Sequence, residues 1–341
     1  MKRRTKYGWL LLVIIASMMV TACGSNNGNG NEDAGGEAAK TMEIGIIQLV
    51  EHPSLDAARE GFEAALEDAG YKDGAEIKID FQNAQGDPTN NVTIAQKFAA
   101  DDKDLVLAIA TSSAQAVKKM VDNAPILFTA ITDPLGSNLV GDLEAPEGSI
   151  TGMSDTHQNE IEEMMTFIAE NVPSVKTVGI VFNEGEQNSV VAVERVEQSL
   201  EQLGIELKTA SVVNSSEVKQ AAESLASKVD AFYVPKDNVV VAGLEALLKV
   251  AGDEDLPVFA GEKNSVERGA FASFSIDYFD IGYETGKMAV EILKNGKQPA
   301  DLPVRFPEKL DLVLNLKAAE EQGIEVSKEL LDKVEEENLI K

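Results

Sequence analysis

The stretch EIGIIQLVEHPSLDAAREGFEAALEDAG, residues 43–70, decides the fold class of this chain. Its first eight residues form a short apolar run that is typical of a buried strand. Apolar residues such as Leu55 and Phe62 then recur at helical spacing over 54–70, and Gly70 stands where a helix C-cap is expected. A buried strand that leads directly into an amphipathic helix predicts a βα unit of a parallel sheet.

The same alternation continues along the chain. In the first half it predicts strands at 77–81, 105–110 and 126–129, a helix from about residue 88 and a helix over 113–121. A second series then starts afresh, with helices at 158–170, 187–203, 216–228 and 238–251, and strands at 177–182, 206–211, 231–234, 257–260 and 270–274. Strands that alternate with helices predict an α/β fold of two similar lobes, each a doubly wound parallel sheet.

The composition excludes several classes of function. The 341 residues include 58 acidic and 30 basic side chains, which give a formal net charge of −28. Nucleic-acid binding needs a footprint of Lys and Arg, so a nucleic-acid partner is not expected. Cys23 is the only cysteine, which excludes an intrachain disulfide framework and multi-thiolate metal sites. With only two histidines and no phosphate-binding or dinucleotide-binding glycine motif, neither a metal nor a cofactor is expected.

The N-terminus has the features of a lipoprotein signal peptide. Residues 1–22 carry four cationic side chains and no acid, and 9–16 form an apolar run too short to span a bilayer comfortably. The small residues before Cys23 resemble the lipobox of bacterial lipoproteins, which predicts that Cys23 is lipidated. An ordinary signal peptide with a chance cysteine is the alternative. Residues 23–41 then read as a lipid-anchored flexible linker rich in Gly and Asn, and removal of 1–22 leaves a net charge of −32.

Polar residues follow nearly every predicted strand. Ligands of open parallel sheets bind beyond the carboxyl ends of the strands, so the loops there are candidates for a binding site. These loops are residues 48–54, 110–113, 132–134, 183–189, 235–238, 261–262 and 273–277. Any one Ser, Asp or Asn among them can instead be a helix N-cap or a turn residue. Seven such loops together favour a ligand site between two facing sheets.

The same loops carry a resemblance to a known family. IIQLVEHPSLDAAREGFEAALEDAGY, NAQGDPTNN, ITDPLGSNLVG, GMSD, YVPKDN and SIDYFDIGYETGKMAVEIL, in this order, are similar to ABC-transporter substrate-binding proteins, more narrowly to the tryptophan/tyrosine-type binding lipoproteins. The resemblance covers roughly residues 43–335. It implies a type I periplasmic-binding-protein fold, with an N-terminal lobe of 42–155 plus 279–306 and a C-terminal lobe of 156–278 plus 307–341. The lobes would be joined by a hinge and close on a small ligand.

The resemblance also implies a ligand chemistry. An amino acid needs a carboxylate site, for which we expect Thr111, Ser112 and Ser113 at the start of a helix. Its ammonium group needs an acid, and the candidates are Asp133, Asp237 and Asp277. We place most weight on the last two, because both follow strands of the second lobe. The other predicted ligand-binding residues are Glu51, His52, Ser54, Leu55, Thr132, Asn183, Asn238, Gly261 and Phe274; core packing is the alternative for Phe274.

These observations predict a binding protein that is not an enzyme. We expect a monomer anchored by lipid on the extracytoplasmic face of the cell membrane, which captures a small ligand, in the first place an aromatic amino acid, and passes it to an ABC permease. A ligand-sensing lipoprotein is one alternative, since transport and sensing use the same clamshell. A hydrolase of a small amide or nucleoside is another, although no Gly-x-Ser-x-Gly elbow occurs and Pro53 between His52 and Ser54 marks a helix start.

Overall fold

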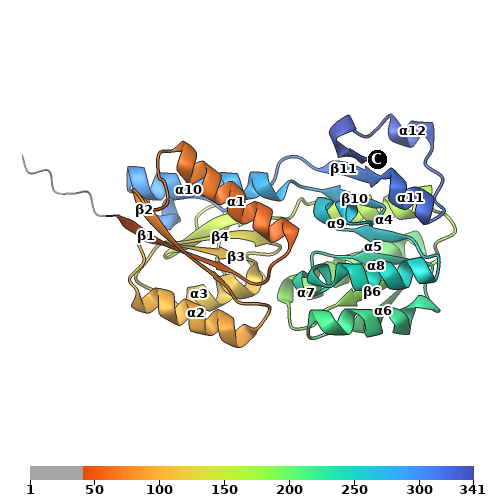
Figure 1. Cartoon of the computed structure of the whole chain (residues 1–341), viewed down its shortest axis with the longest axis horizontal. Coiled ribbons are helices and arrows are strands. Elements are labelled where there is room, and N and C mark those ends of the chain that lie inside the picture. The colour runs from red at the N-terminus through yellow and green to blue at the C-terminus, as the bar shows by residue number, and fades with distance from the viewer. Residues whose placement is uncertain (1–40) are drawn as a thin grey trace, which may run out of the picture. The chain divides into compact units, whose positions relative to one another are not determined.

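The computed structural model describes residues 41–341, which form two β-sheets flanked by helices (Figure 1). The predicted signal peptide, Cys23 and all of the predicted linker except Thr41 lie outside the described residues. Within 41–341, no helix is long and apolar enough to cross a membrane, and no group of His, Cys, Asp or Glu side chains could hold a metal ion.

The first sheet has the strand order β2-β1-β3-β4-β5, and all of its pairs are parallel. Two helices cover each face, α1 with α10 on one and α2 with α3 on the other (Figure 1). Side chains alternate along each strand, so Ile44 and Ile46 pack toward α1 while Ile47 packs toward α2. The elements of this first lobe are β1 (Met42–Gln48), α1 (Pro53–Asp68), β2 (Ile77–Asn83), α2 (Pro88–Ala100), β3 (Leu105–Ile109), α3 (Thr111–Met120), β4 (Ile126–Ile131), β5 (Ile150–Ser154) and α10 (Tyr278–Asn295).

The second sheet has the order β12-β11-β10-β9-β8-β6-β7, with β10 and β11 antiparallel and its other described pairs parallel. Val178 and Ile180 of β6 face one core cluster and Val181 faces the other, so this sheet is also covered on both sides. The elements of this second lobe are α4 (Glu160–Asn171), β6 (Thr177–Phe182), α5 (Gln187–Leu203), β7 (Glu206–Ser211), α6 (Val218–Ala226), β8 (Ala231–Val234), α7 (Asn238–Ala242), α8 (Leu244–Asp253), β9 (Val258–Ala260), α9 (Lys263–Glu267), β10 (Ala272–Ser275), β11 (Asp311–Asn315), α11 (Leu316–Glu321), α12 (Lys328–Leu331) and β12 (Leu339–Ile340).

Three segments connect the lobes: 155–159 between β5 and α4, 276–277 between β10 and α10, and 296–310 between α10 and β11. The third segment runs beside β5, where the backbone N–H of Ser154 donates to the carbonyl oxygen of Arg305 at 2.9 Å. The carboxyl ends of β4, β5, β8, β9 and β10 thus lie close to these connections.

Glycines allow α1 and α10 to pack closely in the first lobe. A Cβ atom on Gly282 would lie 1.9 Å from the carbonyl oxygen of Ala58, and one on Gly61 would lie 2.0 Å from the carbonyl oxygen of Phe279. Neither position can accept a side chain without moving a backbone. Because α10 follows directly from a connecting segment, this contact fixes the end of the connection to the first lobe.

Several parts of the secondary structure differ from the sequence prediction, which did not include α9, β11, α11, α12 or β12. The predicted helix over 238–251 is two helices, α7 and α8, separated at Gly243. The break fits a close approach there, since a Cβ atom on Gly243 would lie 2.9 Å from the carbonyl oxygen of Ser215. Strand β5, which no pattern predicted, completes the first sheet after a long loop.

Candidate functional site

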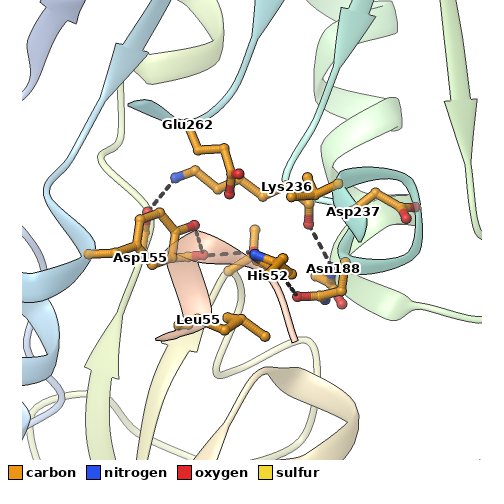
Figure 2. A pocket seen from close by; sticks show the side chains of 12 residues that line it. His52, Leu55, Asp155, Asn188, Lys236, Asp237 and Glu262 are labelled. Atoms are coloured by element: carbon orange, nitrogen blue, oxygen red, sulfur yellow. Dashed lines mark hydrogen bonds between the residues drawn. The ribbon is translucent and has the colours of Figure 1, made fainter. Parts of the chain in front are cut away.

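A small cavity lies between the two lobes, at the carboxyl ends of their strands. Figure 2 shows His52 and Leu55, which come from the start of α1, facing side chains from the loops of the second lobe. The lining residues are His52, Leu55, Ala130, Thr132, Asp155, Asn188, Lys236, Asp237, Asn238, Val241, Glu262 and Tyr278. The cavity volume of about 10 Å³ is close to the minimum for a single water molecule. A ligand of amino-acid size therefore enters only when the lobes separate or these side chains move.

The fold places the lining residues at the carboxyl end of a strand or in the loop and first helical turns that follow it. Ala130 is near the end of β4 and Asp155 directly follows β5. Across the cavity, Lys236 follows β8 and Glu262 follows β9, while Tyr278 is the first residue of α10. Both lobes therefore contribute side chains, which is the arrangement that lets a ligand favour closure.

Asp155 is a buried carboxylate held by neutral donors. Its side chain accepts hydrogen bonds from the hydroxyl of Tyr278 at 2.9 Å and from the hydroxyl of Thr132 at 3.2 Å. The residue is only 3% exposed. These bonds fix the orientation of the carboxylate without neutralising its charge.

Lys236 is the cation of the cavity, and it is already engaged. Its ammonium group lies 2.8 Å from the Oε2 atom of Glu160, and both side chains are 7% exposed. The same group donates to the backbone carbonyl of Asp155. Burial alone would lower the pKa of Lys236, but the charges of Glu160 and Asp155 outweigh it and the pKa is raised. Lys236 is therefore protonated and paired.

The cavity carries an excess of negative charge. Glu262 is 2% exposed and accepts a hydrogen bond from the hydroxyl of Ser265 at 2.9 Å. Once Lys236 is matched by Glu160, the lining carboxylates of Asp155 and Glu262 have no cation bonded to them among residues 41–341. An excess of carboxylate in a buried cavity favours a ligand with a cationic group, such as an ammonium ion.

Direct hydrogen bonds join the lobes at this cavity. The Nε2 atom of His52 lies 3.3 Å from the Oδ1 atom of Asn238, and the hydroxyl of Ser54 donates to the Oδ1 atom of Asn264 at 3.1 Å. Burial lowers the pKa of His52, although Glu262 and the bond to Asn238 act against it. Neutral His52 therefore donates through Nε2, because the amide oxygen can only accept.

Five of the predicted ligand-binding residues line the cavity: His52, Leu55, Thr132, Asp237 and Asn238. Asp237 does so as a helix cap rather than as a free acid. Its carboxylate accepts from the backbone N–H of Val240 at 2.9 Å and from that of Asn183 at 2.6 Å. Ser54 does not line the cavity but joins the lobes beside it.

Asp277, which the sequence prediction favoured together with Asp237, does not line this cavity. It is exposed and caps α10, accepting from the backbone N–H of Phe279 at 2.8 Å and from that of Asp280 at 3.3 Å. Because Asp277 is the N-cap residue of α10, its carboxylate is directed toward the backbone N–H groups of the first helical turn. The next residue, Tyr278, is the one that lines the cavity.

The other predicted residues are also outside the cavity lining. Phe274 packs in the core of the second lobe, with its ring centroid 6.0 Å from that of Phe167, which is the alternative that the sequence left open. The hydroxyl of Ser113 donates to Asn91 at 2.9 Å within the first lobe. The remaining residues outside the lining are Glu51, Thr111, Ser112, Asp133, Asn183 and Gly261.

Seven lining residues were not predicted to bind the ligand: Ala130, Asp155, Asn188, Lys236, Val241, Glu262 and Tyr278. Lys236, Glu262 and Asn188 lie inside loops that the sequence had indicated, one or a few residues from the predicted ones. The signal was therefore the loop, and the sequence did not distinguish which of its side chains faces the cavity. Asp155 had been noted only as the place where the chain crosses between lobes.

Comparison with known proteins identifies the family. A model of the ABC transporter substrate binding protein family matches residues 43–337. The chain belongs to this family. The prediction that it binds a substrate and is not an enzyme is thereby confirmed, as is the predicted fold class, a type I periplasmic-binding-protein fold of two doubly wound sheets.

Individual substrate-binding proteins are closely similar to this one. The tyrosine-binding protein of Clostridioides difficile (strain R20291) is 41% identical over 324 residues, which cover 92% of this chain and 93% of that protein. The crystal structure of the ABC domain in complex with L-Trp from Streptococcus pneumonia has a TM-score of 0.83 and 35% identity, covering 89% of this chain and 100% of that one.

A third relative bears on the arrangement of the lobes. The ligand-free, open structure of a substrate binding protein with adhesive properties from Clostridium difficile is 40% identical and covers 88% of this chain and 98% of that one, yet its TM-score is only 0.64. Identity and coverage are close to those of the L-Trp complex, but the similarity in structure is lower. This substrate-binding protein is thus closer in shape to the complex than to the open structure.

Proposed function

We propose that this protein is the extracytoplasmic receptor of an ABC importer, which captures an aromatic amino acid between its lobes and delivers it to a permease. The observation that carries the proposal is the cavity between the lobes. There the carboxylates of Asp155 and Glu262, which have no cation bonded to them among residues 41–341, lie beside an apolar wall that includes Leu55 and Val241. An amino acid with an apolar side chain matches both properties. The tyrosine-binding relative and the L-Trp complex support an aromatic side chain.

The proposal gives each group of the ligand a partner. Asp155 and Glu262 receive the ammonium group through charge-assisted hydrogen bonds. The positive end of α1, which begins at the cavity, attracts the carboxylate. Leu55, Val241 and the ring of Tyr278 provide apolar contact for the side chain.

Binding works by a shift between open and closed arrangements of the lobes. The cavity of about 10 Å³ is far smaller than the several hundred Å³ usual for ligand pockets, so the ligand is admitted when the lobes part. Residues of both lobes contact it only after closure, and the ligand therefore favours the closed form. Cys23 and the Gly/Asn-rich linker up to residue 41 would hold a monomeric receptor beside the membrane that carries the permease.

Isothermal titration calorimetry tests this proposal. The purified protein is titrated with L-tyrosine, L-tryptophan, L-phenylalanine, L-alanine and glucose. We expect saturable binding of at least one aromatic amino acid and much weaker binding of L-alanine and glucose. Absence of binding by all three aromatic amino acids, or tighter binding of L-alanine or glucose, would contradict the assignment.

A further inference from the structure

Glu186 is a buried carboxylate that stands behind the cavity without lining it. It is the N-cap residue of α5 and is 4% exposed. Its Oε2 atom accepts from the side-chain amide of Asn238 at 2.5 Å, from the backbone N–H of Asn238 at 3.3 Å and from the side-chain amide of Asn188 at 3.3 Å. Both asparagines do line the cavity. A single acid thus contacts two polar side chains of the binding site.

These hydrogen bonds determine which way both amide groups face. An ionised carboxylate can only accept, so the NH₂ groups of Asn188 and Asn238 must turn toward Glu186 and their oxygens must turn away from it. The amide of Asn188 also donates to the backbone carbonyl of Lys236 at 3.0 Å, which fixes the same orientation. The oxygen of Asn238 meets Nε2 of His52 across the cavity.

The oxygen of Asn188 is a buried acceptor without a hydrogen-bond partner among residues 41–341, as are Oε1 of Glu186 and Nδ1 of His52. Water has little access to the Asn188 oxygen, because the residue is only 3% exposed. A buried acceptor without a donor is costly, and a ligand N–H group would satisfy it. The charge excess at Asp155 and Glu262 favours the same kind of ligand group.

We propose that Glu186 is a positioning residue: it holds the amide of Asn188 with its oxygen available to an ammonium group of the ligand, and the amide of Asn238 with its oxygen toward His52. The inference rests on the proposed function, because it assigns how that site distinguishes ligands that carry an amino group. Glu186 acts through the two asparagines and does not itself touch the ligand.

The ionisation of Glu186 gives this arrangement a pH dependence. Burial, followed by the nearby charge of Asp237, raises the pKa of Glu186 to about 7, although the asparagine hydrogen bonds act to lower it. The other ionisable residues next to the two asparagines are Lys236 and His52. Protonated Glu186 can donate to an amide oxygen, so that one asparagine can turn its NH₂ group into the cavity. Affinity for an ammonium ligand then rises with pH through about 7.

The test compares two probes, L-tyrosine and 3-(4-hydroxyphenyl)propionate, which lacks the ammonium group. Calorimetry is done at pH 6 and pH 8 on the full chain, on Glu186→Gln and on Glu184→Gln, a matched control at an exposed position in the same turn. For the unmodified chain and the control we expect about tenfold tighter binding of L-tyrosine at pH 8, because that is the ratio of ionised Glu186 for a pKa of about 7. Glu186→Gln should lose this pH dependence and bind L-tyrosine about 10- to 100-fold more weakly, with little change for the propionate.

The outcomes distinguish failure of the proposed function from failure of the role assigned to Glu186. If the unmodified chain binds no aromatic amino acid, the proposed function fails before Glu186 is considered. If it binds L-tyrosine and Glu186→Gln keeps both the affinity and the pH dependence, the role of Glu186 is refuted while the proposed function stands. Should Glu186→Gln not fold, Asn188→Leu serves instead, since it removes the acceptor at similar size. It must then lose the preference for L-tyrosine over the propionate, and retention of that preference would overturn the inference.

Discussion

The contact between α1 and α10 gives a stability prediction whose sign can be worked out from the structure. Gly282→Ala would place a Cβ atom 1.9 Å from the carbonyl oxygen of Ala58, whereas real Cβ contacts are essentially never shorter than 3.0 Å. The obstructing atom belongs to the backbone, so no side-chain rotation can relieve the clash. One helix must move by more than an ångström, in the part of the first lobe that connects to the cavity through Tyr278.

Two opposing effects set the size of the change. Replacing a glycine in a helix by alanine favours the helix by about 1 kcal/mol. Overpacking in a filled core costs about 1–3 kcal/mol, and more where the backbone itself must move. Because the Cβ atom of residue 282 would meet backbone, we expect a packing cost at the upper end of this range. After the gain in helix propensity is subtracted, the free energy of unfolding should fall by about 2 kcal/mol.

Gly252→Ala is the matched control. Gly252 is an exposed residue of α8. Apart from its chain neighbours and the nearby backbone of its own helix, no atom among residues 41–341 lies within 4 Å of a Cβ atom built on it. The higher helix propensity of alanine is therefore not opposed by a steric clash, and the variant should be more stable by up to about 1 kcal/mol. Urea unfolding followed by circular dichroism measures both variants. A Gly282→Ala protein as stable as the unmodified chain, or one shifted in the same direction as Gly252→Ala, would refute the reasoning from close packing.

Three further predictions concern the cavity, an ion pair and the N-terminus. Asp155→Asn should weaken binding of an aromatic amino acid about 10- to 100-fold in calorimetry, since it removes a carboxylate from the ammonium site at constant size; unchanged affinity would contradict the site. Burial acts to raise the pKa of Asp80, but hydrogen bonds, from Lys97 first, lower it to about 2. This stabilisation is present above pH 3.8 and lost as the pH falls through about 2. The free energy of unfolding of Asp80→Asn should therefore fall less steeply in acid, and an unaltered pH dependence would contradict a stabilising Asp80–Lys97 pair. Cys23→Ser should release the protein from the membrane fraction, as judged by immunoblot, and retention there would argue against lipidation.

Local patterns predicted most of the elements that hold the site. The bounds of β6, β7, β8 and α5 agree with the sequence prediction, because apolar periodicity and the C-cap at Gly204, with φ of +70°, are properties of neighbouring residues. Strand β5 has only a short apolar pattern and gains its place by pairing with β4. The break at Gly243 depends on the approach of a distant backbone, which no local pattern reveals.

For the candidate site, the sequence identified loops better than side chains. Polar residues after parallel strands indicated the correct edge of each sheet, so the loops around Lys236 and Glu262 were found. Which residue of a loop faces the cavity depends on how each backbone turns into the next helix. Asp237 and Asp277 were favoured because both follow strands of the second lobe, yet both carboxylates cap helices. Asp237 lines the cavity together with Lys236, whereas Tyr278 lines it in place of Asp277.

The central claim, that the chain captures an aromatic amino acid between its lobes, is tested most directly by what the protein retains. The purified protein is incubated with an equimolar mixture of the twenty common amino acids, separated from free ligand by gel filtration and denatured, and the released molecules are identified by mass spectrometry. We predict close to one equivalent of tyrosine, tryptophan or phenylalanine per chain. Retention of a non-aromatic amino acid, or of none, would contradict the claim.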